Sequence, residues 1–164
     1  MSQIEIFDHS RDQYFMRDAL ALAAQGAARG EVPVGAVLVQ NGAIIGRGFN
    51  CPISSNDPSA HAEIVAIRIA ATVISNYRLV DSTLYTTLEP CSMCAGLIVH
   101  SRITRLVYGA LEPKAGIVQS QGRFFTQGFL NHRVLFKGGV LAEECRTVLG
   151  DFFRARRDGK LISI

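Results

Sequence analysis

The sequence predicts an α/β fold: a three-layer α/β/α sandwich in which a mixed sheet of about five strands carries helices on both faces. Two observations support this prediction. Asn41-Gly42 stands between two apolar runs, and this pair is the strongest short signal for an antiparallel hairpin because both residues tolerate positive φ. Strand-like and helical segments then alternate through the second half of the chain, which favours parallel pairing of the later strands.

The first half is expected to hold a helix, the hairpin and a second helix. Apolar residues fall near one face of a helix over 12–29, and Gly30 is placed to end it. After a polar loop over 50–60, Ser59 is in position to cap the second helix, over 60–72. The hairpin strands are expected over 34–39 and 43–49.

The second half is expected to supply three strands and two helices. A run rich in β-forming residues predicts the third strand, and Pro90 follows where its ladder must stop. The glycine-punctuated stretch 109–131 gives only a weak signal. The strands are expected over 83–88, 103–108 and 133–136, and the helices over 92–100 and 141–157.

Composition describes a folded protein, expected to form a single domain over 1–164. Hydrophobic residues make up 48% of the 164 residues and charged residues 19%, so the chain can bury a core and is not disordered in bulk. Mean hydropathy is +0.20, yet no apolar run approaches the roughly 18 residues that a membrane-spanning helix needs. The first residues lack the basic and apolar regions of a signal peptide, so we expect a cytoplasmic protein with no membrane association.

The net charge of +3 is concentrated at one end of the chain. Residues 154–160 carry four bases and one acid, which leaves 13 bases and 13 acids in the rest of the sequence. Cations at a helix C-terminus also favour the helix dipole, so this segment is either a solvated helix end or a contact for phosphates. Its bases are Arg154, Arg156, Arg157 and Lys160.

Two short motifs point to a metal centre. His61-Ala62-Glu63 and Pro90-Cys91-Ser92-Met93-Cys94 each fall at the predicted start of a helix, where the helix dipole favours a thiolate. One imidazole and two thiolates suit tetrahedral zinc. Three protein ligands leave a fourth position for water, which is the catalytic pattern. Glu63 lies two residues from His61 and is placed to move the proton of that water.

Other interpretations of these residues remain open. His61 can be a core or capping histidine, and Glu63 can simply oppose the helix dipole. Cys91 and Cys94 can form a redox pair. If Cys51 reached the metal, the site would be a closed, structural Cys₃His centre.

With these residues in place, the chain resembles the zinc nucleobase and nucleoside deaminases of the cytidine/deoxycytidylate deaminase family. Within this family, the chain is similar in detail to the bacterial branch that deaminates adenosine in tRNA. The similarity runs through most of the chain. It implies a cytidine-deaminase-like fold and a homodimer. The segments that carry it lie within 31–39, 57–63, 76–79, 84–96, 131–134 and 151–157.

The resemblance also implies an activity and its residues. The activity is conversion of adenosine to inosine at the wobble position of an arginine tRNA, with the anticodon stem-loop as partner. His61, Cys91 and Cys94 would hold one Zn²⁺ per subunit, and Glu63 would shuttle the proton. Asn50 would contact the flipped adenine.

Further RNA contacts follow from the same resemblance. The loop with Glu112 and Lys114 would contact the base before the target, although Glu112 stands where the family has Asp. The anticodon loop would be touched by Asn131, His132, Phe153 and Arg154. Apart from the resemblance, the charge of the tail makes Arg154, Arg156, Arg157 and Lys160 candidates for phosphate contacts.

Two further functions stay open at the level of sequence. A deaminase of free nucleobases or nucleosides would share the zinc motif. A non-catalytic RNA-binding module would instead need a structural zinc with Cys51 as its fourth ligand.

Overall fold

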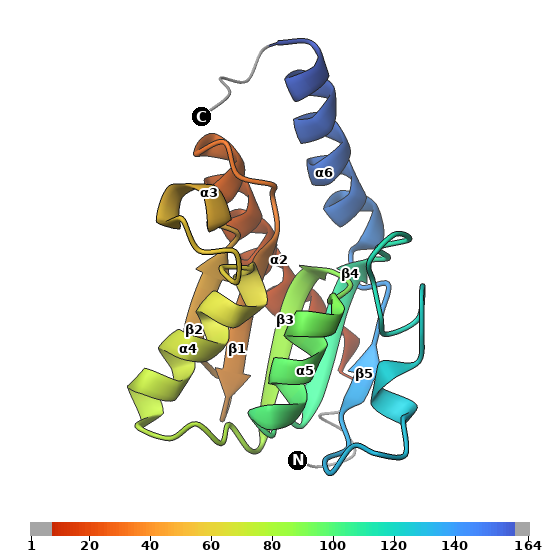
Figure 1. Cartoon of the computed structure of the whole chain (residues 1–164). Helices are drawn as coiled ribbons and strands as arrows, with labels where there is room; N and C mark the ends of the chain where they lie inside the picture. The colour runs from red at the N-terminus through yellow and green to blue at the C-terminus, as the bar shows by residue number, and fades with distance from the viewer. Residues whose placement is uncertain (1–7, 160–164) are drawn as a thin grey trace.

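The computed structural model describes residues 8–159, so Lys160 lies outside the described part of the chain. Figure 1 shows a sheet between two layers of helices, with α4 and α5 on one face and α2 and α6 on the other. The five strands lie in the order β2-β1-β3-β4-β5. The predicted α/β/α class is confirmed.

The observed elements follow the predicted order. The prediction omitted the one-turn helix α3 in the polar loop and the short 3₁₀ helix η1 in the stretch with a weak signal. The elements are α2 (His9–Ala28), β1 (Gly35–Gln40), β2 (Ala43–Phe49), α3 (Pro52–Ser55), α4 (Ala62–Ile74), β3 (Ser82–Leu88), α5 (Ser92–His100), β4 (Arg105–Ala110), η1 (Phe124–Thr126), β5 (Leu135–Lys137) and α6 (Ala142–Arg157).

The sheet is mixed. β1 pairs antiparallel with both β2 and β3, whereas β3, β4 and β5 run parallel. Asn41 and Gly42 both adopt positive φ, 51° and 75°, as a tight hairpin turn requires. The predicted hairpin and the parallel pairing in the second half are therefore confirmed.

Side chains of the central strands alternate between two cores. Leu84 and Leu106 point to the α4 and α5 face, and their neighbours Tyr85 and Val107 point to the α2 and α6 face. All four are buried. A strand buried on both faces lacks the alternation of apolar and polar residues, as the run over 106–108 in β4 shows, whereas β3 also buries several hydroxyl side chains.

Two glycines of β2 let α4 lie directly against the sheet. A Cβ on Gly48 would stand 2.5 Å from the carbonyl oxygen of Ala62, and one on Gly46 would stand 2.2 Å from that of Ala66. Any side chain would push the helix away. The close approach fixes the first turn of α4, which begins beside His61.

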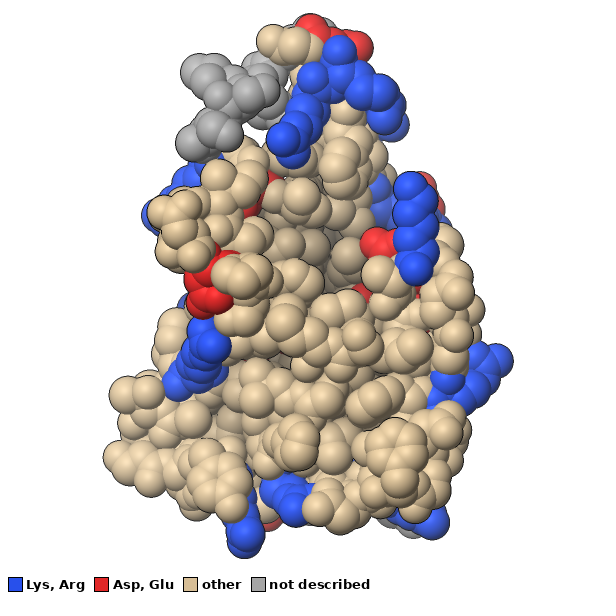
Figure 2. Space-filling model, in the orientation of Figure 1, with Lys and Arg blue, Asp and Glu red and all other residues tan. Residues whose placement is uncertain are grey.

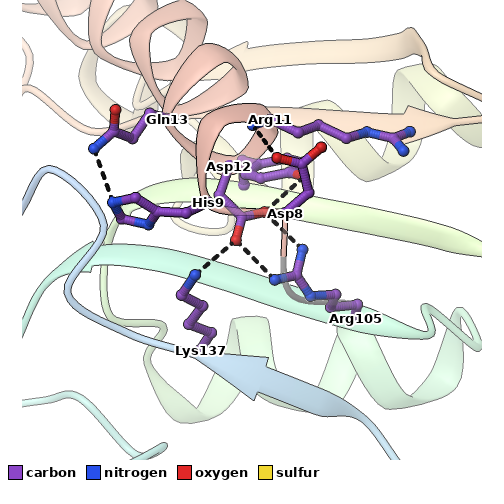
Figure 3. A network of polar contacts seen from close by, with 8 residues as sticks. Asp8, His9, Arg11, Asp12, Gln13, Arg105 and Lys137 are labelled. Atoms are coloured by element: carbon purple, nitrogen blue, oxygen red, sulfur yellow. Dashed lines mark hydrogen bonds and ion pairs between the residues drawn. The ribbon is translucent and has the colours of Figure 1, made fainter. Parts of the chain in front are cut away.

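A buried ion-pair network ties α2 to strands β4 and β5 (Figure 3). Asp12 is 1% exposed and accepts two hydrogen bonds from the Arg105 guanidinium, at 2.7 and 2.8 Å. It also accepts from Lys137 Nζ at 3.0 Å and from the Tyr85 hydroxyl at 3.1 Å. One carboxylate thereby joins α2, β3, β4 and β5.

The predicted cap of the second helix is wrong. The N-cap residue of α4 is His61, and its side chain makes no capping hydrogen bond. Instead the Oδ1 of Asn50 accepts the Ala62 N–H at 2.8 Å. Ser59 is held elsewhere, because its hydroxyl donates to Asp57 Oδ1 in a local turn.

Between residues 8 and 159, no helix combines the length and the apolar character needed to cross a bilayer.

Candidate active site

Three ligand atoms converge where α4 and α5 begin. His61 and Cys91 are the N-cap residues of the two helices, and Cys94 lies in the first turn of α5. His61 Nδ1 is 3.6 Å from the Sγ atoms of both Cys91 and Cys94. Zinc bonds of about 2.3 Å to sulfur and about 2.0 Å to nitrogen, at a tetrahedral angle, put N and S about 3.5 Å apart, close to these distances. The three side chains therefore fit zinc.

A fourth protein ligand is not part of this group. Within residues 8–159, His61, Cys91 and Cys94 form the group of His, Cys, Asp or Glu residues whose ligand atoms all lie within 4.8 Å of one another. Cys51, the N-cap of the separate helix α3, is not among them. The described residues thus give the open, catalytic pattern and not the closed Cys₃His centre.

The electrostatics of the group favour a thiolate. A hydrogen bond from Cys94, helped by one from His61, lowers the pKa of Cys91 to about 3 despite its partial burial. The same Cys91–Cys94 bond, together with burial, raises the pKa of Cys94. The bond to Cys91 also raises the pKa of His61. A metal ion binds the deprotonated forms of these groups, so its binding displaces the protons that Cys94 and His61 hold in its absence.

Glu63 stands beside the ligands as a separate group. It lies in the first turn of α4 and is only 4% exposed. Burial raises its pKa. A buried carboxyl with a raised pKa can take up and release a proton closer to neutral pH than an exposed one.

A cavity of about 130 Å³ opens onto these groups. Its walls come from the segment before β1, the loop after β2, the ends of β3 and the loop after β4. We refer to it as the active-site pocket. Its lining residues are Val32, Val34, Asn50, His61, Glu63, Leu88, Glu89, Cys91, Glu112 and Ala115.

Some of the expected RNA-contacting residues lie at this pocket. Asn50 and Glu112 line it directly. The Oδ1 of Asn50 is committed to the Ala62 N–H, so its NH₂ group is the part left to contact a ligand. The backbone N–H of Lys114 donates to Glu112 Oε1 at 2.9 Å, which orients the Glu112 side chain.

Asn131 and His132 lie at the other end of α5. Asn131 Oδ1 accepts from Arg102 Nη1 at 2.8 Å, and His132 Nε2 is 2.7 Å from the Ile103 carbonyl oxygen. Arg102 and Ile103 follow α5, whereas Cys91 precedes it. The nine residues of α5 span about 13 Å, so the structure does not bring these two residues to the pocket of their own chain.

The basic end of α6 extends beyond the sheet at the same end of the molecule as the helix N-termini that form the metal group (Figures 1 and 2). Phe153 is 42% exposed there, although the adjacent Phe152 is buried. Arg154 pairs with Asp151, one turn earlier on the helix. The last turn of α6 also contains Arg156 and Arg157.

Sequence reasoning did not assign a role to two buried acids at the pocket. Glu31 and Glu89 are 1% and 2% exposed. Glu89 lines the pocket, and Glu31 directly precedes the lining residue Val32. An acid within an apolar stretch is the signal that could have identified them.

An imidazole and two thiolates that fit zinc, beside a buried carboxylate on an α/β/α scaffold, define a metal-dependent hydrolase centre. Residues 9–110 match the family model for the cytidine and deoxycytidylate deaminase zinc-binding region, and the chain belongs to this family. Its fold is accordingly cytidine-deaminase-like.

Individual similar proteins are more specific than the family model. The chain is 54% identical over 152 residues to the tRNA-specific adenosine deaminase of Haemophilus influenzae, covering 92% of this chain and 88% of that protein. It is 47% identical over 150 residues to the protein of the same name from Buchnera aphidicola, covering 91% of this chain and 92% of the relative. A solved structure from a study of A-to-I editing by tRNA:A34 deaminases superposes with a TM-score of 0.81 at 45% identity, covering 83% of this chain and 99% of that one.

Proposed function

We propose that this protein is a zinc-dependent deaminase that converts adenosine to inosine at the wobble position of a tRNA, as its relatives' names indicate. The observation that carries the proposal is Glu63, a buried carboxyl that lines the same pocket as the metal ligands His61 and Cys91. Water is the co-substrate and ammonia the second product, so no redox partner is needed.

His61, Cys91 and Cys94 would hold the zinc ion, which when bound supplies Lewis-acid activation of water near neutral pH. Glu63 carries the proton transfers. Its carboxylate accepts one proton of the attacking water and delivers it to N1 of the purine. It then takes the remaining proton from the new hydroxyl at C6 and passes it to the amine, which leaves as ammonia. Its burial supports this role because it brings the pKa of the carboxyl nearer to the working pH.

The other pocket residues bind and orient the base. The free NH₂ group of Asn50 is a hydrogen-bond donor for an acceptor nitrogen of the adenine. Glu112, held by the Lys114 backbone, contacts the neighbouring nucleotide. An anticodon loop is already single-stranded, so extruding one base into the pocket costs little.

The basic end of α6 contacts the RNA backbone. Phe153 offers an exposed ring for stacking, and Arg154, Arg156 and Arg157 offer cations for phosphates. Lys160, outside the described residues, belongs to the same proposal. A tRNA substrate also accords with the cytoplasmic location expected from the sequence.

We further propose a homodimer that forms through the exposed face of α5. Figure 2 shows a broad area without Lys, Arg, Asp or Glu across the middle of this face of the molecule. Phe129 is 76% exposed and Met93 40% exposed. Beside them, Gly96, Val99, His100 and Phe124 line a hollow of about 240 Å³. A second copy would fill this surface, and Asn131 and His132 would then serve the RNA of the other subunit.

A substrate panel tests the proposed function. The zinc-loaded protein is incubated with an arginine-tRNA anticodon stem-loop, and separately with free adenosine, guanine and cytosine. Inosine from the stem-loop alone is the expected result. Turnover of free bases without inosine in the stem-loop would replace this proposal with the nucleobase alternative. Sedimentation of wild type and Phe129→Asp tests the dimer, with a halved mass expected for the variant.

A further inference from the structure

A buried carboxylate outside the metal group organises one wall of the active-site pocket. Glu89 is 2% exposed and makes no ion pair with any residue among 8–159. It accepts backbone N–H groups of Gln119 at 2.7 Å, Ser120 at 2.9 Å and Glu112 at 3.0 Å. The hydroxyl of Ser120 donates to it as well. Four donors thus satisfy a carboxylate that would otherwise be costly to bury.

The segment that supplies these donors has little structure of its own. Residues 111–122 form neither helix nor strand. Besides the bonds to Glu89, the Ile117 N–H donates to the Pro90 carbonyl oxygen at 3.0 Å. The segment packs so tightly on the carboxylate that a Cβ on Gly116 would stand 2.4 Å from the carboxyl carbon of Glu89.

A turn bond from the Gly116 N–H to the Glu112 carbonyl oxygen, at 2.9 Å, and burial of Val118 in the core also hold the segment. Glu89 adds the bonds that fix the backbone at its two ends, at Glu112 and at residues 119–120.

This segment is also the wall that carries Glu112 and Ala115 into the pocket. The metal ligands and Glu63 are positioned by another part of the fold, because His61 and Cys91 are the N-caps of α4 and α5 and Glu63 and Cys94 lie in their first turns. A change in the segment therefore alters the fit of the substrate while it leaves the reacting groups in place.

The part of the pocket wall that contains Val32 and Asn50 is held in a similar way. Glu31 is 1% exposed and accepts the backbone N–H of Ser54 at 2.7 Å and of Ile53 at 3.4 Å. These bonds hold the loop after Asn50, and Val32 beside Glu31 lines the pocket. Two buried glutamates thus each hold a loop beside the cavity.

We propose that Glu89 is a positioning residue of the deaminase, which holds segment 112–120 against the pocket and so sets the affinity for the nucleotide. The role rests on the proposed function, since it concerns the substrate of that reaction.

Two variants test the role from different sides. Glu89→Gln turns an NH₂ group toward donors and loses at least one of the four bonds. Gly116→Ala keeps the carboxylate but forces the segment away from it. Both are expected to raise KM for the stem-loop about tenfold while kcat stays within threefold, because loss of uniform binding affects KM alone. Glu144→Gln, on the exposed side of α6, is the matched control and should match wild type.

Three further measurements separate this role from others. Zinc content should stay at one per chain in both variants. Amide hydrogen exchange at residues 112–120 should become faster, and stem-loop affinity measured without turnover should fall by the same factor as KM rises. A fall in kcat with loss of zinc would overturn the proposal, and so would faster exchange with unchanged KM and affinity. If the wild type made no inosine, the proposed function would fail, whereas the exchange and affinity results would still decide the role of Glu89.

Discussion

Removing the charge of Asp12 should destabilise the protein strongly, although the residue lies far from the active-site pocket. Asp12 is the carboxylate that faces Arg105, whose side chain is only 3% exposed, and Lys137, whose side chain is 34% exposed. In Asp12→Asn, Lys137 can turn to solvent, but the guanidinium stays buried without a counter-charge (Figure 3). Breaking a buried pair in this way costs about 3–5 kcal/mol. For a chain of this size that lowers Tm by about 6–20 °C.

The assay is urea unfolding followed by circular dichroism on the zinc-loaded protein. Glu143→Gln is the control, because its ion pair with Arg146 is exposed and should contribute less than about 1 kcal/mol. A free energy of unfolding for Asp12→Asn within 1 kcal/mol of wild type, as in the control, would refute the reasoning.

Acid provides a second check on the same network. Burial alone would raise the pKa of Asp12, but the hydrogen bonds and charges of Arg105 and Lys137 outweigh it and hold the pKa below its usual value. A carboxyl whose pKa is lower in the folded chain stabilises the fold above its ordinary pKa of about 4 and loses that contribution as the pH falls further. The difference in stability between wild type and Asp12→Asn should therefore be full at pH 6 and shrink below about pH 4. A difference that stayed constant to pH 2 would contradict this account.

Three other changes test the site and the RNA surface. Cys91→Ser should abolish zinc binding, measured by atomic absorption, whereas Cys51→Ser should retain one zinc per chain; zinc loss in Cys51→Ser would restore the closed structural site. Gly48→Ala forces α4 off β2, so it should cost about 1–3 kcal/mol in unfolding and weaken zinc binding through the displaced first turn. Replacing Arg154, Arg156 and Arg157 by Gln should reduce the slope of log affinity against log salt by about 2, at about 0.7 per lost phosphate contact, and an unchanged slope would remove α6 from the RNA surface.

The metal group could be predicted from the sequence because its geometry is local. Cys91 and Cys94 are one helical turn apart, and His61 opens another helix, so the motif spacing already places the ligands on first turns. The hairpin was predictable for the same reason, since Asn41-Gly42 determines its turn. In both cases a few neighbouring residues decide the structure.

Contacts between distant segments could not be predicted in this way. Glu89 is bonded to residues 23 to 31 positions away, and the pairing of Asp12 with Arg105 spans 93 positions. The cap of α4 shows the same limit. Ser59 is the residue type that favours a cap, but Asn50, twelve positions before Ala62, takes that place because the fold brings its loop to the helix.

The measurement that tests the central claim most directly compares zinc-loaded wild type with Glu63→Gln on the arginine-tRNA anticodon stem-loop. Inosine is quantified after nuclease digestion, and zinc content and unfolding are measured in both proteins. Because a positioned proton shuttle contributes about 10²–10⁴ in rate, the variant should keep zinc and fold but lose at least about a hundredfold in kcat. Inosine formation by Glu63→Gln at the wild-type rate, or none by the wild type with zinc bound, would contradict the account.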